Sequence, residues 1–580
     1  MTTTLRVLAL LLCLTLSMTA QAAARIFFTD LESGPKTGGE NNNGVYVTLY
    51  GRGFGATQGS VTVGGGAAII KSWTQGGTTG LRWPLDKVVI QLGTNAATGD
   101  IVLTPSAGGA SNALPFTVRA GSIYFVSTNG TGDGAIGTPM SGQAAYAAIA
   151  PGVTFYFRAG TYNQVYGDPY NIYNYGFAAA QSGTVGNPVV WNAYPGETVT
   201  FHYATADRSN FHFHDAGDHG EYITIANFTL EGASYCVGGG GWWEDEDSGP
   251  TNNRIIGNIM SADYAEGVNT MTGLISSEGA NVEILGNEFK NTGIGSPINN
   301  NHIIYMNTGG DNPHVAWNYI HDVRVGHVIQ LHQDPFGGVH KYFGTNVRIH
   351  DNIITSPDPQ GCRGINIGDT ANAPRTSGYI YNNLLVNLGQ DFSAILAYSG
   401  DWKVFNNTLV DIQAEASHFS YAIGVSSGGT GMDQGTIEVR NNIITLKTAT
   451  SQYVGSTLLG DLDDAPVSNN LYYGRSGGLP SQDASPINAD PLLVNAAAND
   501  FRLQGGSPAR NTGSSTVSSV VLVDLDGQTR PQGGIYDIGA YEYVGGAGCG
   551  VGQTCLPFLL SDLDEAALDD FFAMAANSTP

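Results

Sequence analysis

The sequence is poor in positive charge, in cysteine and in long hydrophobic runs, and each shortage narrows what the protein can be. It has 24 Lys and Arg residues against 49 Asp and Glu, which gives a formal net charge of −25. This charge argues against nucleic acid or anionic lipid as a partner, because both would be repelled. An acidic polysaccharide stays compatible, since Lys and Arg residues gathered in a cleft bind anions even on an acidic protein.

The apolar run nearest the N-terminus, residues 7–18, is 12 residues long, and neither it nor any later segment is long enough to cross a bilayer. Arg6 precedes this run, and the small residues Ala20 and Ala22 follow it, as in a secretory signal peptide. We therefore expect residues 1–24 to be removed on export. The mature protein is then secreted or periplasmic, without a membrane span.

The composition indicates an all-β protein with many tight turns. Charged residues make up only 13 % of the chain, whereas it contains 80 Gly and 28 Tyr. Abundant glycine is typical of turn-rich folds, and a hydrophobic content of 42 % is too high for a disordered chain.

Residues 25–120 predict a separate small β-sandwich. Residues 45–50 alternate apolar and polar side chains, and short strands follow at 60–63, 87–92, 100–104 and 114–118. The sequence VTLYGRGFG at residues 47–55, followed by VTVG at 61–64, resembles the IPT/TIG immunoglobulin-like family. The resemblance implies an immunoglobulin-type sandwich that serves as a spacer or interaction module.

An asparagine recurs between apolar residues through the centre of the chain, at spacings of 24 to 35 residues. The series is Asn227, Asn258, Asn287, Asn318, Asn352, Asn383, Asn407 and Asn442. Such a period predicts a solenoid with one coil per repeat. A turn asparagine can take a left-handed conformation and bond to the next asparagine in the stack, so we expect these residues to form a ladder.

Both flanks of this region resemble the secreted pectate-lyase-like β-helix superfamily. The resemblance lies in YFVSTNG at residues 124–130 and TFYFRAGTY at 154–162, and in DPLL at 490–493 and DIGAYE at 537–542. It implies a right-handed parallel β-helix over residues 122–543. The superfamily includes lyases, hydrolases, epimerases and non-catalytic adhesins, so it does not by itself choose a reaction. Residues 544–580 are interpreted as a Gly-rich linker and a short acidic helix, and we expect a monomer.

The cysteines fit this interpretation. Cys549 and Cys555 are close enough in sequence to close a small loop in an oxidising compartment. Cys236 and Cys362 fall four coils apart, which corresponds to about 19 Å at the strand spacing. A disulfide needs Cα atoms within about 7 Å, so we expect this pair to be unbonded.

The best candidate for a binding cleft is a second strand that recurs in each coil, at residues 302–306, 327–331, 364–367, 394–397 and 422–425. Period-two alternation places Ile304, Ile329 and Ile365 in the core. The outward positions then hold Tyr305, Asn307, Gln330, His332 and Asn366. The following loops add Asp334, Lys341 and Asp369, and Arg363 precedes the third of these strands.

These residue types suit β-elimination at a uronic acid, which needs a neutralised carboxylate and a base for the C5 proton. Lys341 or His332 is the candidate base, Tyr305 the proton donor to the leaving oxygen, and Arg363 the partner of the carboxylate. Asn307, Gln330 and Asn366 are candidate substrate-binding residues. For each single residue the alternative is a solvated surface side chain.

Two further features border this face. Trp242 and Trp243 precede an acidic run and can stack on sugar rings, which would extend the binding face. Asp334 and Asp369 end equivalent strands, and their oxygens are of the kind that Ca²⁺ takes. We therefore expect no certain cofactor, with Ca²⁺ as the candidate; the alternative is that both aspartates only form turns.

Three functions stay open at this point. A polysaccharide lyase acting on a uronate-containing polymer is favoured. A glycoside hydrolase would need two carboxyl groups flanking the bond, and this face offers no neighbouring Asp pair. A non-catalytic glycan-binding or cell-surface protein is the third reading, for which the IPT/TIG-like domain is suggestive.

Overall fold

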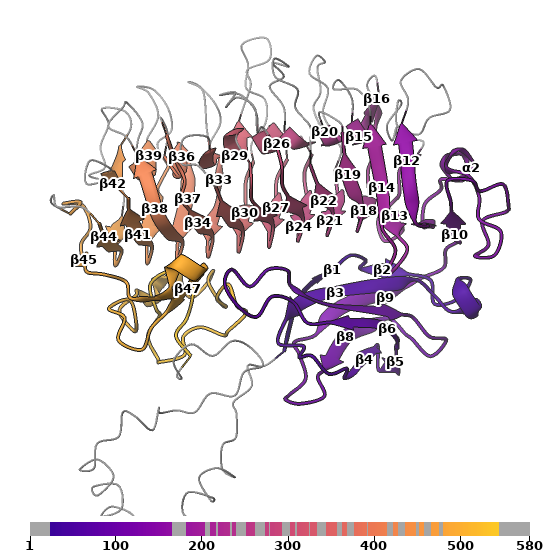
Figure 1. Cartoon of the computed structure of the whole chain (residues 1–580), viewed down its shortest axis with the longest axis horizontal. Coiled ribbons are helices and arrows are strands. Elements are labelled where there is room, and N and C mark those ends of the chain that lie inside the picture. Colours follow the sequence, from indigo (N-terminus) through magenta and orange to yellow (C-terminus); the bar gives the residue numbers. More distant parts are fainter. Residues whose placement is uncertain are drawn as a thin grey trace, which may run out of the picture.

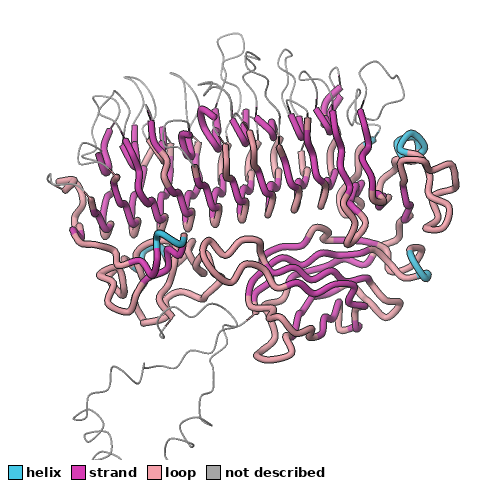
Figure 2. Tube along the Cα trace, viewed as in Figure 1, coloured by secondary structure: helices cyan, strands magenta, loops and turns pink. Residues whose placement is uncertain are grey.

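The protein is an elongated stack of β-coils with two smaller units packed along one side (Figure 1). The computed structural model describes residues 24–164, 181–203, 209–215, 218–232, 235–238, 251–261, 273–277, 279–292, 302–307, 310–323, 325–332, 344–356, 362–367, 376–390, 393–398, 400–414, 421–426, 435–447, 452–456, 466–474 and 479–544. Within these residues the regular structure is nearly all strand, interrupted by the short helix α2 (Gly142–Ala147) and a few 3₁₀ turns (Figure 2). The predicted all-β class is confirmed.

The N-terminal unit is a two-sheet β-sandwich. One sheet has the order β1 (Arg25–Thr29), β3 (Tyr46–Arg52), β7 (Asp86–Gln91), β6 (Ile69–Thr74), and the other β2 (Ser33–Gly34), β9 (Leu114–Val118), β8 (Gly99–Thr104), β4 (Ser60–Val63), β5 (Gly66–Ala67). Alternate residues such as Leu49, Ile90 and Leu103 are fully buried between the sheets. The strands predicted from the sequence are present, while membership of the IPT/TIG family stays a prediction.

The remaining strands form a right-handed parallel β-helix in which each full coil contributes one strand to each of three rows. The first row is a 12-stranded parallel sheet. Its members are β10 (Ile123–Val126), β11 (Thr154–Phe157), β13 (Val189–Ala193), β18 (Ile223–Ala226), β21 (Arg254–Ile256), β24 (Glu283–Leu285), β27 (His314–Ala316), β30 (Val347–His350), β33 (Ser377–Tyr381), β37 (Asp401–Phe405), β40 (Ile437–Arg440) and β43 (Val467–Ser468). The predicted solenoid is confirmed.

The other two rows share a 22-stranded sheet that bends between them. The second row comprises β12 (Gly160–Gln164), β14 (Val199–Tyr203), β19 (Thr229–Glu231), β22 (Ile259–Met260), β25 (Glu288–Phe289), β28 (Tyr319–Ile320), β31 (Ile353–Thr355), β34 (Leu384–Val386), β38 (Thr408–Ala414), β41 (Ile443–Leu446), β44 (Leu471–Tyr473) and β45 (Ile487–Asn488). The third row comprises β15 (Ser209–His212), β20 (Tyr235–Gly238), β23 (Gly273–Ser277), β26 (His302–Asn307), β29 (Val325–His332), β32 (Cys362–Ile367), β36 (Ile395–Tyr398), β39 (Tyr421–Ser426) and β42 (Gln452–Ser456), with β35 (Gly389–Gln390) between the rows.

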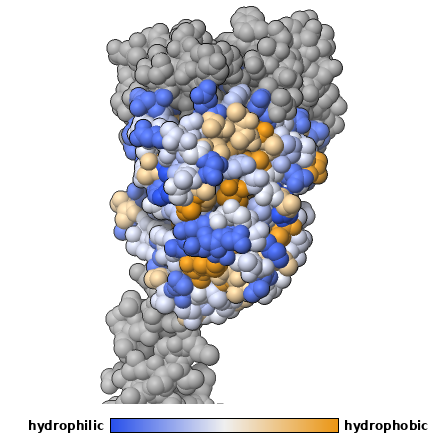
Figure 3. Space-filling view, turned by 90° about the vertical axis from the view of Figure 1, so that its right-hand side faces the viewer, coloured by the Kyte–Doolittle hydropathy of each residue, from blue (hydrophilic) through white to orange (hydrophobic). Residues whose placement is uncertain are grey.

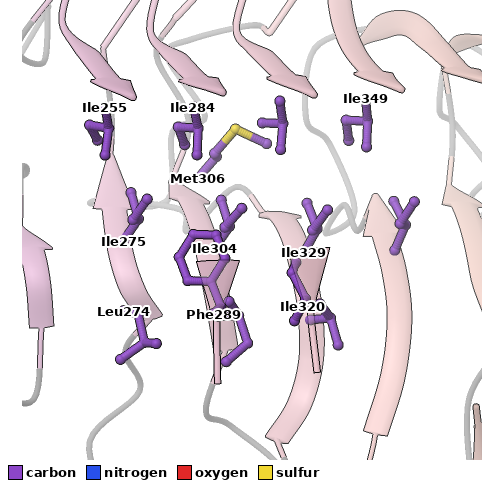
Figure 4. Packing of buried hydrophobic residues seen from close by; sticks show 14 of the residues in the cluster. Ile255, Leu274, Ile275, Ile284, Phe289, Ile304, Met306, Ile320, Ile329 and Ile349 are labelled. Carbon is purple, nitrogen blue, oxygen red and sulfur yellow. The ribbon is translucent and has the colours of Figure 1, made fainter. Parts of the chain in front are cut away.

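The core runs the length of the coils and is filled by aliphatic stacks. Ile255 and Ile284 of the first row face Ile275 and Ile304 of the third row, with Phe289 entering from the second (Figure 4). All five side chains are fully buried. Because β-branched residues at the same position of successive strands stack in register, each coil buries its apolar face only against its neighbours.

The asparagine ladder is real, but its composition and its conformation differ from the prediction. It runs from Asn258 to Asn470 and ends on Asp483, with side-chain amide to side-chain oxygen distances of 2.9–3.2 Å. Asn227 was wrongly included, because strand register aligns Ala226 with Ile256 and so makes Phe228 the counterpart of Asn258.

The left-handed conformation belongs to the residue before each ladder position. These residues have φ between +51° and +65°. They are Asn227, Gly257, Gly286, Trp317, Asp351, Asn382, Asn406, Asn441 and Asn469. The ladder asparagines are not left-handed, since each uses its side chain to bond across coils while the preceding residue makes the turn.

This left-handed row is where the sandwich docks on the first coils. The hydroxyl of Tyr50 contacts the side-chain oxygen of Asn227, and a Cβ at Gly257 or Gly286 would collide with Tyr50 or Phe28. Phe27 stacks on Trp317 at a ring-centroid distance of 5.3 Å. The sandwich is therefore packed along the helix as one continuous interface, which a simple spacer would not need.

The coils end at β45, and residues 490–544 form a segment that folds back onto the later coils. It contains the hairpin β46 (Leu493–Asn495) and β47 (Asp500–Leu503). The left-handed asparagines of these coils donate to its backbone carbonyls: Asn382 to Val523, Asn406 to Asp537, Asn441 to Ser514 and Asn469 to Thr512, at 2.7–3.1 Å. The predicted β-helix span of 122–543 thus contains coils to β45 and then this segment.

The opposite end of the helix carries β10 and α2. Seen from this end, small hydrophilic and hydrophobic patches alternate over the first coil and the sandwich (Figure 3).

Cys236 is buried with a free thiol, as predicted for the unbonded pair. Among the described residues no helix is both long and apolar enough to cross a membrane. The predicted signal peptide, Cys549, Cys555 and the acidic tail lie outside the described residues.

Candidate active site

The candidate face is built by the adjacent third-row strands β26, β29 and β32. Their register pairs Tyr305 with Gln330 and Gln330 with Asn366. Ile304, Ile329 and Ile365 form the neighbouring inward row and are fully buried. The alternation predicted from the sequence is therefore confirmed at these positions, and the three polar side chains lie side by side, one coil apart, at a strand spacing of about 4.8 Å.

A second outward row, which the sequence analysis missed, consists of His302, His327 and Arg363. The ring of His302 stacks on that of Tyr305 with centroids 4.9 Å apart, and on that of His327 at 5.9 Å. All three members of this row are at least nine-tenths buried.

The reason the row was missed is a break in the alternation at the start of each strand. Both Ile303 and Ile304 point into the core, as do Val328 and Ile329 in the next coil. Strict period two would turn His302 and His327 inward, whereas the break leaves them on the outward side. Histidine at the same register of successive coils was the signal that could have revealed them.

The contacts of His327 define the tautomer of its neutral ring. Its Nε2 lies 3.4 Å from Nη1 of Arg363 and 3.3 Å from Nδ2 of Asn366. A guanidinium only donates hydrogen bonds, so Nε2 must be the acceptor, and the proton of a neutral imidazole then sits on Nδ1. His327 thereby orients both the Arg363 guanidinium and the Asn366 amide.

The amide oxygens on this face are available for a ligand. Oε1 of Gln330 and Oδ1 of Asn366 are buried and accept no hydrogen bond within the described part of the chain. Buried polar atoms are nearly always paired in folded proteins. Two such acceptors in neighbouring coils are therefore expected to meet donors on a bound molecule.

The structure does not bring all predicted site residues together. Asn307 and His332 are in register at the ends of β26 and β29, but their side chains are not described. The other predicted residues lie outside the described ranges: Lys341, Trp242, Trp243, Asp334 and Asp369. Among the described residues no group of three His, Cys, Asp or Glu side chains is arranged to hold a metal ion. The Ca²⁺ site stays a prediction.

A second polar cluster lies on the first row beneath the sandwich. His314 and His350 face each other with Nε2 atoms 2.8 Å apart, and Nδ1 of His350 lies 2.5 Å from Oδ2 of Asp351. Burial lowers the pKa of His314 to about 4 and that of His350 to about 3, and it raises the pKa of Asp351. Trp317 packs its ring edge-on against both imidazoles. Phe27 and Phe28 of the sandwich stack on the same Trp317, so the sandwich covers this cluster and the third row is the candidate site.

The described residues form a parallel β-helix whose third row carries an outward polar face. A family model described as "Disaggregatase related" matches residues 344–525, less than half of the chain. No curated protein sequence matches.

Several solved structures are similar to this chain at low identity. Pectate lyase Pel9A is 17 % identical with a TM-score of 0.36, and the match covers 72 % of this chain and 96 % of that one. A rhamnogalacturonan lyase is 14 % identical with a TM-score of 0.39, covering 60 % and 87 %. The family 28 exopolygalacturonase of Yersinia enterocolitica is 10 % identical with a TM-score of 0.34, covering 80 % and 98 %.

Proposed function

We propose that the protein is a secreted polysaccharide-degrading enzyme, a lyase that cleaves a uronic-acid-containing polymer by β-elimination. The observation that carries this proposal is the buried guanidinium of Arg363 on the outward face. It lies in one row with the imidazole of His327, and the adjacent row supplies the phenol of Tyr305 and two amides. This is a cationic and hydrogen-bonding surface on a chain whose net charge is −25. Such a local cation favours a carboxylate-bearing substrate.

The reaction assigns one task to each group. Arg363 neutralises the uronate carboxylate, which makes the C5 proton more acidic. A base, Lys341 or His332, takes that proton; the C4–C5 double bond forms as the bond from C4 to the glycosidic oxygen breaks. Tyr305 returns a proton to the departing oxygen. Lys341 and the His332 side chain lie outside the described structure, so the choice of base is left to mutagenesis.

The register of the row supports a polymer running along the helix axis. On one side of Tyr305 the same row continues through Ser276 and Gly238, and on the other side of Asn366 it continues through Leu396 and Gly424. Gly238 and Gly424 at the two ends of this stretch carry no side chain that would obstruct a polymer, so successive sugar units can follow the coils.

A glycoside hydrolase is the competing function on this fold. It would need two carboxyl groups flanking the glycosidic bond. The nine third-row strands of the described structure contain no Asp or Glu, so both carboxyls would have to come from elsewhere. A basic, amide-lined face suits elimination better than acid-catalysed hydrolysis.

The test is to incubate the mature chain with polygalacturonate or alginate and follow ultraviolet absorbance and reducing ends together. A lyase yields both signals, whereas reducing ends without absorbance would establish hydrolysis and overturn the proposal. Arg363→Ala should lower turnover by about tenfold to 150-fold, since it removes a charge-assisted contact of about 1.5–3 kcal/mol. Lys403→Ala, which removes a cation that lies over Tyr379 on the first row, is the matched control and should leave turnover unchanged.

A further inference from the structure

Two amides on the candidate face have a feature that the reaction itself does not use. Gln330 and Asn366 are 8 % and 6 % exposed, lie in register on adjacent coils, and carry buried side-chain oxygens that accept no hydrogen bond within the described residues. An unmet buried acceptor is destabilising, because it has lost its hydrogen bond to water without gaining another. A bound donor would remove this penalty at both positions.

The orientation of the Asn366 amide is fixed by its neighbour. Its Nδ2 donates toward Nε2 of His327, which also receives Arg363. Reversing the amide would place its oxygen against the acceptor nitrogen of His327, which is unfavourable. The oxygen of Asn366 is therefore presented as an acceptor rather than a donor, and on the same strand as the guanidinium three positions earlier.

We propose that Gln330 and Asn366 are specificity-determining residues whose side-chain oxygens accept hydrogen bonds from two neighbouring hydroxyl groups of the sugar. This inference rests on the proposed function for its substrate, a uronate whose carboxylate is held by Arg363. Two acceptors one coil apart suit a vicinal diol, in which both hydroxyls donate in the same direction. The site then selects uronates with both hydroxyls free.

Polymers in which these hydroxyls are substituted should bind poorly. An O-acetyl group removes the donor and brings an ester oxygen toward an amide oxygen, so that two acceptors face each other across a buried space. Sites that hydrogen-bond a hydroxyl strongly reject analogues that lack it, because the buried protein group is left unpaired. We expect at least a tenfold preference for free over acetylated polymer, which corresponds to about 1.4 kcal/mol.

The experiment compares polygalacturonate and alginate, each free and chemically O-acetylated, by affinity electrophoresis and by product absorbance. Wild type should bind and cleave the free polymers at least tenfold better. Asn366→Leu and Gln330→Leu should each weaken binding of the free polymers and reduce the preference to below threefold. Gln330→Asn keeps an acceptor oxygen on a neutral amide and should retain more of the preference than Gln330→Leu. Asn281→Gly, in an exposed amide stack outside this face, is the control and should behave as wild type.

The outcomes separate the two proposals. Binding with preference but no cleavage would overturn the lyase function and leave the specificity pair standing. Cleavage with an unchanged preference in both leucine variants would overturn the specificity pair and leave the lyase. Failure to bind any of the four polymers would overturn both, because the row would then recognise neither the carboxylate nor the diol.

Discussion

The guanidinium of Arg82 and the carboxylate of Asp526 form a buried ion pair between residues 444 positions apart. Arg82 belongs to the sandwich loop before β7, and Asp526 belongs to the segment that covers the last coils. The two units that pack on the helix are thus joined to each other over its middle. Their side chains are only 3 % and 7 % exposed, so the pair is shielded from solvent and salt.

Removing one partner of this pair should be strongly destabilising. Arg82→Met leaves the Asp526 carboxylate buried without its cation, which costs about 3–5 kcal/mol in the free energy of unfolding. The double variant Arg82→Met/Asp526→Leu should recover most of that loss. Urea unfolding followed by tryptophan fluorescence measures both. Lys71→Ala, which breaks the exposed pair with Glu40, is the control and should cost at most about 1 kcal/mol. Equal losses in Arg82→Met and Lys71→Ala would show that the junction carries no special stability.

The buried ladder should be far more sensitive than the exposed amide stack. The Asn352 amide donates to Val315 O, His350 O and Asn383 Oδ1, and its oxygen accepts from Asn318. Asn352→Ala leaves several buried groups unpaired and should lower the free energy of unfolding by about 3 kcal/mol or more. Asn346→Gly, which loses one exposed amide contact at a left-handed position, should cost less than about 1 kcal/mol. The same urea titration measures both free energies of unfolding. A small loss of stability in Asn352→Ala would mean that water replaces the hydrogen bonds of the ladder.

Gly286 tests whether the docking of the sandwich depends on a missing side chain. Gly286→Ala introduces a Cβ into the Phe28 ring and also strains a φ of +64°. Gly534→Ala strains a φ of +83° with nothing within 4 Å of the new Cβ. The strain common to both is about 1–2 kcal/mol. The expected result is a clearly larger fall in melting temperature for Gly286→Ala than for Gly534→Ala. Adding Phe28→Ala to the Gly286→Ala variant should partly restore the melting temperature. Indistinguishable melting temperatures of the two glycine variants would refute the steric explanation.

The buried histidines predict acid sensitivity. Burial lowers the folded-state pKa of His314 to about 4, below the usual value of 6.5. The unfolded chain therefore binds the extra proton first, and stability falls as pH drops from about 6.5 to about 4, at up to about 1.4 kcal/mol per pH unit. Glu283 and Asp351 face this cluster from the carboxylate side, and Arg348 from the cationic side.

The measurement is the slope of unfolding free energy against pH in wild type and in His314→Gln. The variant should have a shallower slope between pH 6.5 and 4. The carboxyls of Asp351 and Asp524 have raised pKa values, that of Asp524 about 8, and these contribute stability that is lost as pH rises. The Asp524 contribution is common to both proteins and cancels in their difference, which reports His314 together with Asp351 and Glu283, the two carboxyls coupled to it. Identical slopes would exclude the titration of His314.

Inward and outward residues of the third row should separate stability from turnover. Ile365→Ala opens a cavity in the core and should cost about 2–5 kcal/mol of stability. His332→Ala or Lys341→Ala should instead remove most catalysis on polygalacturonate or alginate. The melting temperature should stay nearly unchanged, since polar residues predicted from the sequence to face outward contribute little packing. Full activity in both of the latter variants would remove them from the site.

The local sequence pattern alone predicted the coils, because every repeat buries its apolar side chains and pairs its ladder asparagine in the same way as its neighbours. The inward rows of Ile304, Ile329 and Ile365 follow from period-two alternation, and the ladder follows from one asparagine per turn. The errors were local as well: Phe228 occupies a ladder position in place of an asparagine, and the paired core residues Ile303 and Ile304 turn His302 outward against strict alternation.

The sequence by itself determined the solenoid, its repeat length and most of the residues that face its core, because those features depend on contacts that recur at a fixed separation. Only the tertiary structure decided what covers the coils and which side chains meet. Asn441 bonding to Ser514, Tyr50 resting on Gly257, and Arg82 reaching Asp526 each join segments with no common period. The sequence pattern shows the type of each residue but not which distant residue it contacts, so these contacts are known only from the folded structure.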